Sequence, residues 1–176
     1  MHMTLIRPKR SHSAAGRGAS GYALLEAMVA VLVAAVGFIG AARMQTLGMT
    51  LGSSAQSRQK ATLLGYQMTD RIRANRMGFD AGNYNSPANN GATTCLGSGC
   101  TPALLAAADV AQWAAEVAAT LPKGAAVVCR DSSPSDGTYD GVTVTPACDN
   151  SGDVIAVKIW WIDNVATTQF VTMVRP

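Results

Sequence analysis

Residues 22–42 form an apolar block that constrains this chain more than any other feature. The block is 21 residues long and contains a single charge, Glu26. About 20 helical residues cross the hydrocarbon core of a bilayer, whereas the apolar part of a cleaved secretory signal spans only about 7–15 residues. The block therefore predicts a membrane-spanning helix near the N-terminus.

The segment before the block, residues 1–21, is basic. It holds no acid and carries a formal charge of +4, from Arg7, Lys9, Arg10 and Arg17. Such a flank favours the cytoplasmic side of a membrane. Its small residues, Ala14 to Gly21, come before the apolar block instead of after it, so a cut after Gly21 would leave the helix on the mature protein. We therefore expect a cytoplasmic leader and an exported remainder.

Glu26 is the exception within the apolar block. An ionised carboxylate is costly in a bilayer, so charges at such positions usually mark function. The alternative is that Glu26 lies near the membrane edge and snorkels to water. The block alone leaves both interpretations open.

Gly21, Tyr22, the Leu24-Leu25-Glu26 run and the long apolar stretch together resemble the class III signal of type IV prepilins and type II secretion pseudopilins. In that family a membrane peptidase cuts after the glycine and methylates the new N-terminal residue. The resemblance implies cleavage between Gly21 and Tyr22 and methylation of Tyr22, although phenylalanine is usual at that position. It also gives Glu26 a role in setting the register between subunits, opposite the free amine of a neighbour.

The resemblance continues from residue 61 to residue 76. The run Met68-x-Asp70-Arg71-Ile72-Arg73-Ala74-Asn75 is similar to the stem of the minor pilins called type IV pilus modification proteins (PilV-type minor pilins). This implies an α+β type IV pilin fold, in which a long N-terminal helix packs on a small antiparallel β-sheet head. The expected parts are a leader (1–21), a transmembrane and stem helix (22–76) and a periplasmic or extracellular head (77–176).

The function implied by the resemblance is structural. A minor pilin is inserted in the inner membrane with its head in the periplasm, takes part in initiating pilus assembly, and is incorporated near the tip of the surface filament. The implied partners are prepilin peptidase, the assembly platform, the major pilin, other minor pilins and a tip adhesin. The alternative is a minor pseudopilin of the type II secretion system.

Four cysteines lie in the distal half, at Cys95, Cys100, Cys129 and Cys148. An even number in an exported region predicts two disulfides. Three pairings are possible. We favour Cys95–Cys100, which closes a glycine-containing loop, and Cys129–Cys148, which can join neighbouring strands. Their spacing fits no common zinc finger and no histidine lies nearby, so we expect no metal.

The pattern of apolar and turn-forming residues after the stem predicts one further helix and several strands in the head. Ala61, Leu64, Met68 and Ile72 form a stripe at helical spacing that we expect to pack against the head. Residues 78–101 are typical of a loop and residues 102–120 of a second helix. The expected strands are 125–130, 138–145, 154–162 and 168–174, with a hairpin turn at Asp163-Asn164. Trp160 lies on the strand face opposite Trp161, where it either covers the core edge or is a candidate interface residue.

Other function classes are weaker. The sequence contains only two histidines, His2 and His12, both in the expected leader, so a mature chain has none for a histidine-dependent mechanism and we expect neither an enzyme nor a cofactor. The stem carries a basic stripe that could hold nucleic acid, although no aromatic residues interleave with it: Arg58, Lys60, Arg71, Arg73 and Arg76. Five aspartates suggest calcium only weakly, because their spacing fits no EF-hand: Asp131, Asp136, Asp140, Asp149 and Asp153.

Overall fold

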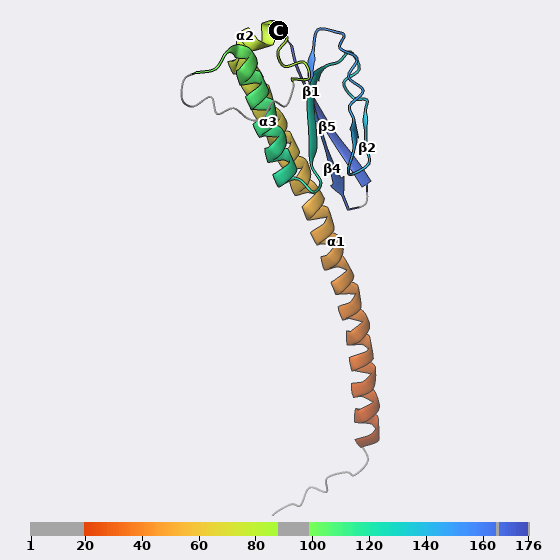
Figure 1. Cartoon of the computed structure of the whole chain (residues 1–176). Helices are drawn as coiled ribbons and strands as arrows, with labels where there is room; N and C mark the ends of the chain where they lie inside the picture. Colours follow the sequence, from red (N-terminus) through yellow and green to blue (C-terminus); the bar gives the residue numbers. More distant parts are fainter. Residues whose placement is uncertain (1–19, 88–98, 165, 176) are drawn as a thin grey trace, which may run out of the picture. The chain divides into compact units, whose positions relative to one another are not determined.

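The structure is a computed structural model that describes residues 20–87, 99–164 and 166–175. The chain divides into two compact units, residues 1–47 and residues 48–176, and helix α1 (Ser20–Ala74) contributes to both. The second unit also holds the remaining elements (Figure 1): α2 (Arg76–Asp80), α3 (Pro102–Thr120), β1 (Ala125–Arg130), β2 (Thr138–Tyr139), β3 (Val144–Thr145), β4 (Ile155–Asp163) and β5 (Ala166–Val174). The expected α+β class, with a long apolar N-terminal helix and a small antiparallel sheet, is confirmed.

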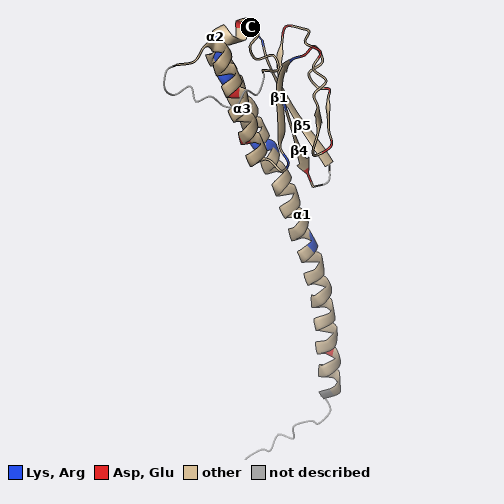
Figure 2. Ribbon diagram, in the orientation of Figure 1, with Lys and Arg blue, Asp and Glu red and all other residues tan. Residues whose placement is uncertain are grey.

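The first unit consists of helix in its described part. Every residue from 21 to 47 is exposed, and Figure 2 shows that charged residues are sparse along this part of α1. A helix that is apolar on all sides is stable only in lipid or among other helices. By length and composition, this is a helix able to span a membrane, as predicted.

Helix α1 ends at Ala74 instead of Arg76, because Asn75 leaves helical geometry and caps α2. Its side-chain oxygen accepts a hydrogen bond from the Gly78 backbone at 3.1 Å, and its side-chain nitrogen donates to the Pro102 carbonyl at 2.8 Å. Asn75 thereby ties α1, α2 and the start of α3 together. The segment predicted as a loop from residue 78 thus begins inside a short helix.

The main sheet has the strand order β1-β4-β5, with both pairs antiparallel. The pair Asp163–Ala166 closes the β4–β5 hairpin, and Asn164 takes a left-handed φ of 58° in the intervening turn. This is one residue later than the predicted turn, and β5 begins two residues earlier than predicted.

The predicted strand 138–145 is wrong. Residues 138–139 and 144–145 instead pair with each other as β2 and β3. Between them the Asp140 carboxylate accepts hydrogen bonds from the Val142 and Thr143 backbones at 2.8 and 2.6 Å, and Gly141 has a φ of 94°. An Asp-Gly turn of this kind reverses the chain where a continuous strand was expected.

One face of the sheet packs on the helices. The predicted α1 stripe lies in the core with residues from α3, β1, β4 and β5, which confirms its packing role. The Trp113 indole of α3 donates a 2.8 Å hydrogen bond to the Leu64 carbonyl of α1. Gly65 allows α1 to approach β5 closely, since a Cβ at that position would lie 2.4 Å from the Phe170 ring.

Candidate functional site

The N-terminal turn of α1 carries the residues singled out by the prepilin-like motif. The Gly21–Tyr22 bond lies in this turn, the Tyr22 side chain is 77% exposed, and a Cβ at Gly21 would meet no atom within 4 Å. Glu26 follows one helical turn after Tyr22. Its carboxylate is exposed and has no hydrogen-bond or ion-pair partner among the described residues. The site is therefore accessible, and the Glu26 carboxylate is unpaired within the part of the chain that the structure describes.

The apolar side chains around this site receive little protection from the chain itself. The large ones between Tyr22 and Met44 are 54% to 78% exposed. Burying a Leu, Val, Ile or Phe side chain gains about 1.5–3 kcal/mol, so this surface has a strong tendency to enter lipid or to pack against other apolar helices. The first unit is thus long and apolar enough to span a membrane, and its exposed surface is suited to packing against other apolar helices.

The second candidate region is a disulfide-closed loop on the head, residues 129–148. Cys129 and Cys148 form a disulfide with a Cα–Cα distance of 6.1 Å, which confirms that predicted pairing. Cys100 is also disulfide-bonded. Its predicted partner, Cys95, lies outside the described residues.

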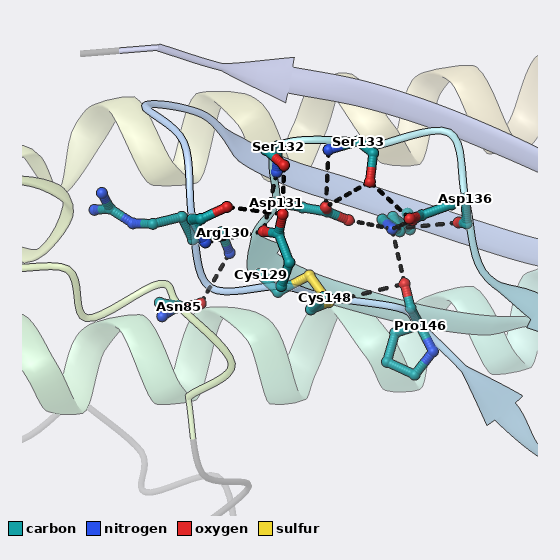
Figure 3. The surroundings of a disulfide bond; sticks show 12 residues. Asn85, Cys129, Arg130, Asp131, Ser132, Ser133, Asp136, Pro146 and Cys148 are labelled. Atoms are coloured by element: carbon teal, nitrogen blue, oxygen red, sulfur yellow. Dashed lines mark hydrogen bonds and ion pairs between the residues drawn. A yellow bond between two sulfur atoms is a disulfide. The ribbon is translucent and has the colours of Figure 1, made fainter.

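Lys158 of β4 pairs with several residues of this region, and Figure 3 shows Asp131, Asp136 and Pro146, which it contacts, beside the disulfide. Its side chain is completely buried, and its Nζ lies 2.5 Å from Asp131 Oδ2 and 2.7 Å from Asp136 Oδ1. The same ammonium donates to the Pro146 carbonyl at 2.7 Å. A buried charge is tolerated only when it is paired and hydrogen-bonded, and here both conditions are met by residues of the disulfide-closed loop.

Aspartates in the loop and directly after it are held by similarly local contacts. Hydrogen bonds from Lys158 and Ser133 lower the pKa of Asp136 below its ordinary value. Hydrogen bonds from Ser132 and then Ser151 lower the pKa of Asp149. The Asp136 carboxylate joins the loop to Lys158 of β4, and the Asp149 carboxylate joins Ser132 to Ser151, so both help to fix the loop.

One group of side chains in this region has the spacing of metal ligands, but its atoms are already bonded or paired. Atoms of Cys129, Asp131 and Cys148 lie within 4.8 Å of one another. Both sulfurs, however, are joined in the disulfide, so neither can act as a thiolate ligand. The remaining carboxylate, that of Asp131, is already paired with Lys158.

The candidate interface role of Trp160 is corrected by the structure. Its side chain is only 1% exposed. It lies on the same face of β4 as Lys158, the face that the disulfide-closed loop covers. A partner therefore cannot contact Trp160 unless that loop moves, and the other interpretation, that it covers the core edge, agrees with its burial.

The basic stripe of the stem is partly neutralised by nearby acids. Arg76 lies 2.9 Å from Asp80, Arg73 lies 3.7 Å from Asp70, and Arg71 lies 3.8 Å from Glu116. Exposed pairs of this kind contribute little to stability, but they reduce the net charge offered to a polyanion. The stripe therefore gives no support to nucleic-acid binding.

Sequence reasoning missed Lys158 as a structural residue. A usable signal was present, because the run Ile155-Ala156-Val157-Lys158-Ile159-Trp160-Trp161 contains no other polar residue. A strand that is apolar at both odd and even positions is typically covered on both faces. A lysine in such a strand must then find buried acceptors, and the aspartates of the preceding loop were the available ones.

No family model, no curated protein and no solved structure gives a significant match to this chain. The prepilin-like motif therefore rests on the residues themselves. The fold agrees with it, and the function that it implies remains a proposal.

Proposed function

We propose that this chain is a minor pilin of a type IV pilus. The observation that carries the proposal is the first half of α1. This half is apolar and exposed on all sides, and it carries the Gly21–Tyr22 pair of the prepilin-like motif in its first turn. Among its described residues it holds one unpartnered carboxylate, Glu26. Such a helix suits a subunit that waits in a membrane and then moves into a bundle of like helices.

Glu26 provides the register of that bundle in this proposal. After cleavage, the Tyr22 amine of each subunit is a free cation at the start of an apolar helix. A lone charge is costly to bury, and an amine–carboxylate pair costs much less. Glu26 of a neighbouring subunit supplies the counter-charge at one axial offset only, so pairing selects how far one helix is shifted along the next.

The head supplies specificity in this proposal. Prepilin peptidase processes the chain while its helix is in the inner membrane and its head is in the periplasm. The assembly platform then brings it together with other minor pilins to prime the filament, and it leaves the membrane beside the major pilin and a tip adhesin. The disulfide on the head supports an oxidising location of this kind.

Mass spectrometry of the N-terminus, in sheared surface filaments and in membranes, tests the proposal. We expect a methylated peptide that begins at Tyr22 in the filaments. The same peptide confined to membranes would favour the secretion pseudopilin. An intact leader that continues through Gly21-Tyr22 in both fractions would overturn the proposal.

The role of Glu26 is tested separately with an isosteric neutral variant. Glu26→Gln should be cleaved normally but enter filaments at least tenfold less often, whereas Glu26→Asp, which keeps the charge, should retain much of the incorporation. Quantitative immunoblots of sheared filaments and membranes measure the ratio. Equal incorporation of Glu26→Gln and the unchanged chain would remove the register role.

A further inference from the structure

The two edges of the main sheet are treated differently by the chain. At the β1 edge, the Arg130 backbone N–H donates to the Asn85 side chain at 2.8 Å, and the Ser86 backbone N–H donates to the Val128 carbonyl at 3.1 Å. The segment around residues 85–86 thus occupies outward-facing hydrogen-bonding groups of β1. This edge is closed.

The β5 edge is open as far as the described residues are concerned. In an antiparallel hairpin closed by a two-residue turn, the flanking pair is hydrogen-bonded and the bonding alternates from there. Asp163 and Ala166 flank the turn, so even-numbered residues of β5 bond to β4 and odd-numbered residues point outward. The outward backbone groups belong to Thr167, Gln169, Val171 and Met173. No backbone hydrogen bond joins them to another element within the part of the chain that the structure describes.

The open edge also lacks the usual protection against strand pairing. Natural sheets guard their edges with charged side chains, prolines, bulges or short strands. Strand β5 is nine residues long, pairs with β4 without a break, and contains neither a charged residue nor a proline. Its sequence therefore permits another strand to add along its length.

Side chains of β5 hold the strand in place while leaving its edge open. Thr167 Oγ1 donates to the Tyr139 carbonyl at 2.9 Å, and Gln169 Nε2 donates to the Asp136 carbonyl at 3.1 Å. Both acceptors belong to the disulfide-closed loop on one face of the sheet. A preordered edge binds an incoming strand at a lower entropic cost.

We propose that the free edge of β5 binds an extended segment of another polypeptide by β-strand addition. The hydrogen-bonding groups of the edge specify an extended backbone as the occupant. Charge sets its direction, because the exposed Arg175 directly follows β5, whereas the Asp163 carboxylate at the end of β4 already accepts a hydrogen bond from Ser54 of α1. An antiparallel segment of about nine residues, uncharged in the middle, with an acid near its N-terminal end, is complementary to this edge.

This inference goes beyond the proposed function and does not depend on it. A free β5 edge would receive a strand on the head of a pilin, a pseudopilin or any other anchored protein. Tests of leader cleavage or filament incorporation therefore leave it untouched.

Amide hydrogen exchange of the full chain in detergent micelles tests the open edge directly. We expect slow exchange at Thr168, Phe170 and Thr172 and fast exchange at Gln169, Val171 and Met173, because only the first group bonds to β4. Equal protection of both groups in the free chain would overturn the proposal, since the edge would already be occupied.

A synthetic peptide of Thr and Val residues with one Glu at its N-terminal end is a suitable probe, because it has the expected charge arrangement and β-propensity without repeating the sequence of β5. We expect saturable binding, measured by fluorescence anisotropy, and protection of the three outward amides. In the full chain, Val171→Pro removes one outward N–H and should weaken binding at least tenfold. The matched variant Val171→Thr keeps that N–H and the β-branched shape, so it should bind as the unchanged chain does.

Two further outcomes would overturn the proposal. One is a peptide that fails to bind, or that binds Val171→Pro as tightly as Val171→Thr while both variants keep the protection of Phe170 and Thr172. The other is self-association of the full chain that Val171→Pro abolishes, because the occupant would then be a second copy of β5. Light scattering on the same samples detects it.

Discussion

The two faces of β4 are buried by different means. On one face, Ile155, Val157, Ile159 and Trp161 pack into an apolar core with α1 and α3. On the other face, Ala156, Lys158 and Trp160 are equally buried, but beneath a loop that is closed by a disulfide and held by an ion pair. One strand thus has an apolar core on one side and a polar, covalently closed cover on the other.

The difference shows how a small sheet can be covered on both sides without a second layer of helices. The helix face depends on apolar area, which is non-directional and tolerates conservative changes of shape. The loop face depends on a few directional contacts. Loss of the Lys158–Asp131 pair leaves a charge buried without a partner, and loss of the disulfide leaves the loop open. We therefore expect mutations on the two faces to differ in size and in how they can be rescued.

The largest effect is expected at Lys158. Lys158→Ala leaves the Asp131 carboxylate buried without its partner, so we expect the head to lose about 3–5 kcal/mol of unfolding free energy. Urea unfolding in detergent, followed by the fluorescence of the three buried tryptophans, measures the loss. The double variant Lys158→Met/Asp131→Leu removes both charges and should recover most of it. A double variant as unstable as Lys158→Ala would show that shape, and not charge pairing, dominates this face.

The disulfide should have the next largest effect. Cys129→Ala/Cys148→Ala opens a loop with a sequence separation of 19 residues, and the entropy of the opened chain predicts a loss of about 3 kcal/mol. The same urea titration reports it, under oxidising and reducing conditions. Reduction of the unchanged chain should lower the midpoint at least as far as the variant does under oxidising conditions, because it also opens the disulfide of Cys100. If neither changes the urea midpoint, the ion pair alone is sufficient to hold the loop.

On the helix face, Gly65→Ala should cost about 1–2 kcal/mol. The new Cβ would lie 2.4 Å from the Phe170 ring, so the ring must shift, and the gain in helix propensity offsets only part of that cost. Gly52→Ala is the matched control, because a Cβ there meets no atom within 4 Å. It should be neutral or stabilising by up to about 1 kcal/mol. Equal effects at the two glycines would contradict close packing between α1 and β5.

The smallest effect is expected from pH. The pKa values of Asp136, Asp140 and Asp149 are lowered in the folded chain by hydrogen bonds to the charged carboxylates. The unfolded chain therefore binds protons first, and stability that is present above about pH 4 is lost as the pH falls further. Urea midpoints should be flat between pH 7 and pH 5 and decline below about pH 4. Asp149→Asn should reduce the decline, and a midpoint that rises on acidification would contradict the assignment.

The elements that followed a single strong signal were predicted well from the sequence. Strand β1 and helix α3 have the predicted bounds, since β1 is a short apolar run that directly follows Gly124, and Pro102 and the Pro122-Gly124 pair delimit α3. The α1 stripe and the Cys129–Cys148 pairing were also predicted. In each case a local pattern and the tertiary contact specify the same arrangement.

The errors arose where a polar side chain serves a tertiary contact that no periodic pattern records. Asn75 ends α1 early because its amide reaches Pro102, far along the chain. Asp140 caps a turn inside a segment that reads as one strand. Trp160 looks like a surface residue until the loop closes over its face of β4. The open β5 edge has the same origin, because a sequence of strands does not state which of them lies at the end of a sheet.

The proximity of Lys158 to the disulfide couples the formation of the disulfide to the formation of the lysine contacts. Asp131 lies two residues after Cys129, and Pro146 lies two residues before Cys148, so the ammonium holds both ends of the loop at once. In the reduced chain these contacts raise the effective concentration of one thiol at the other. By linkage, oxidation strengthens the charge contacts by the same factor. The Lys158 contacts and the Cys129–Cys148 disulfide therefore form cooperatively. A head in which Lys158 is out of place also forms this disulfide less readily.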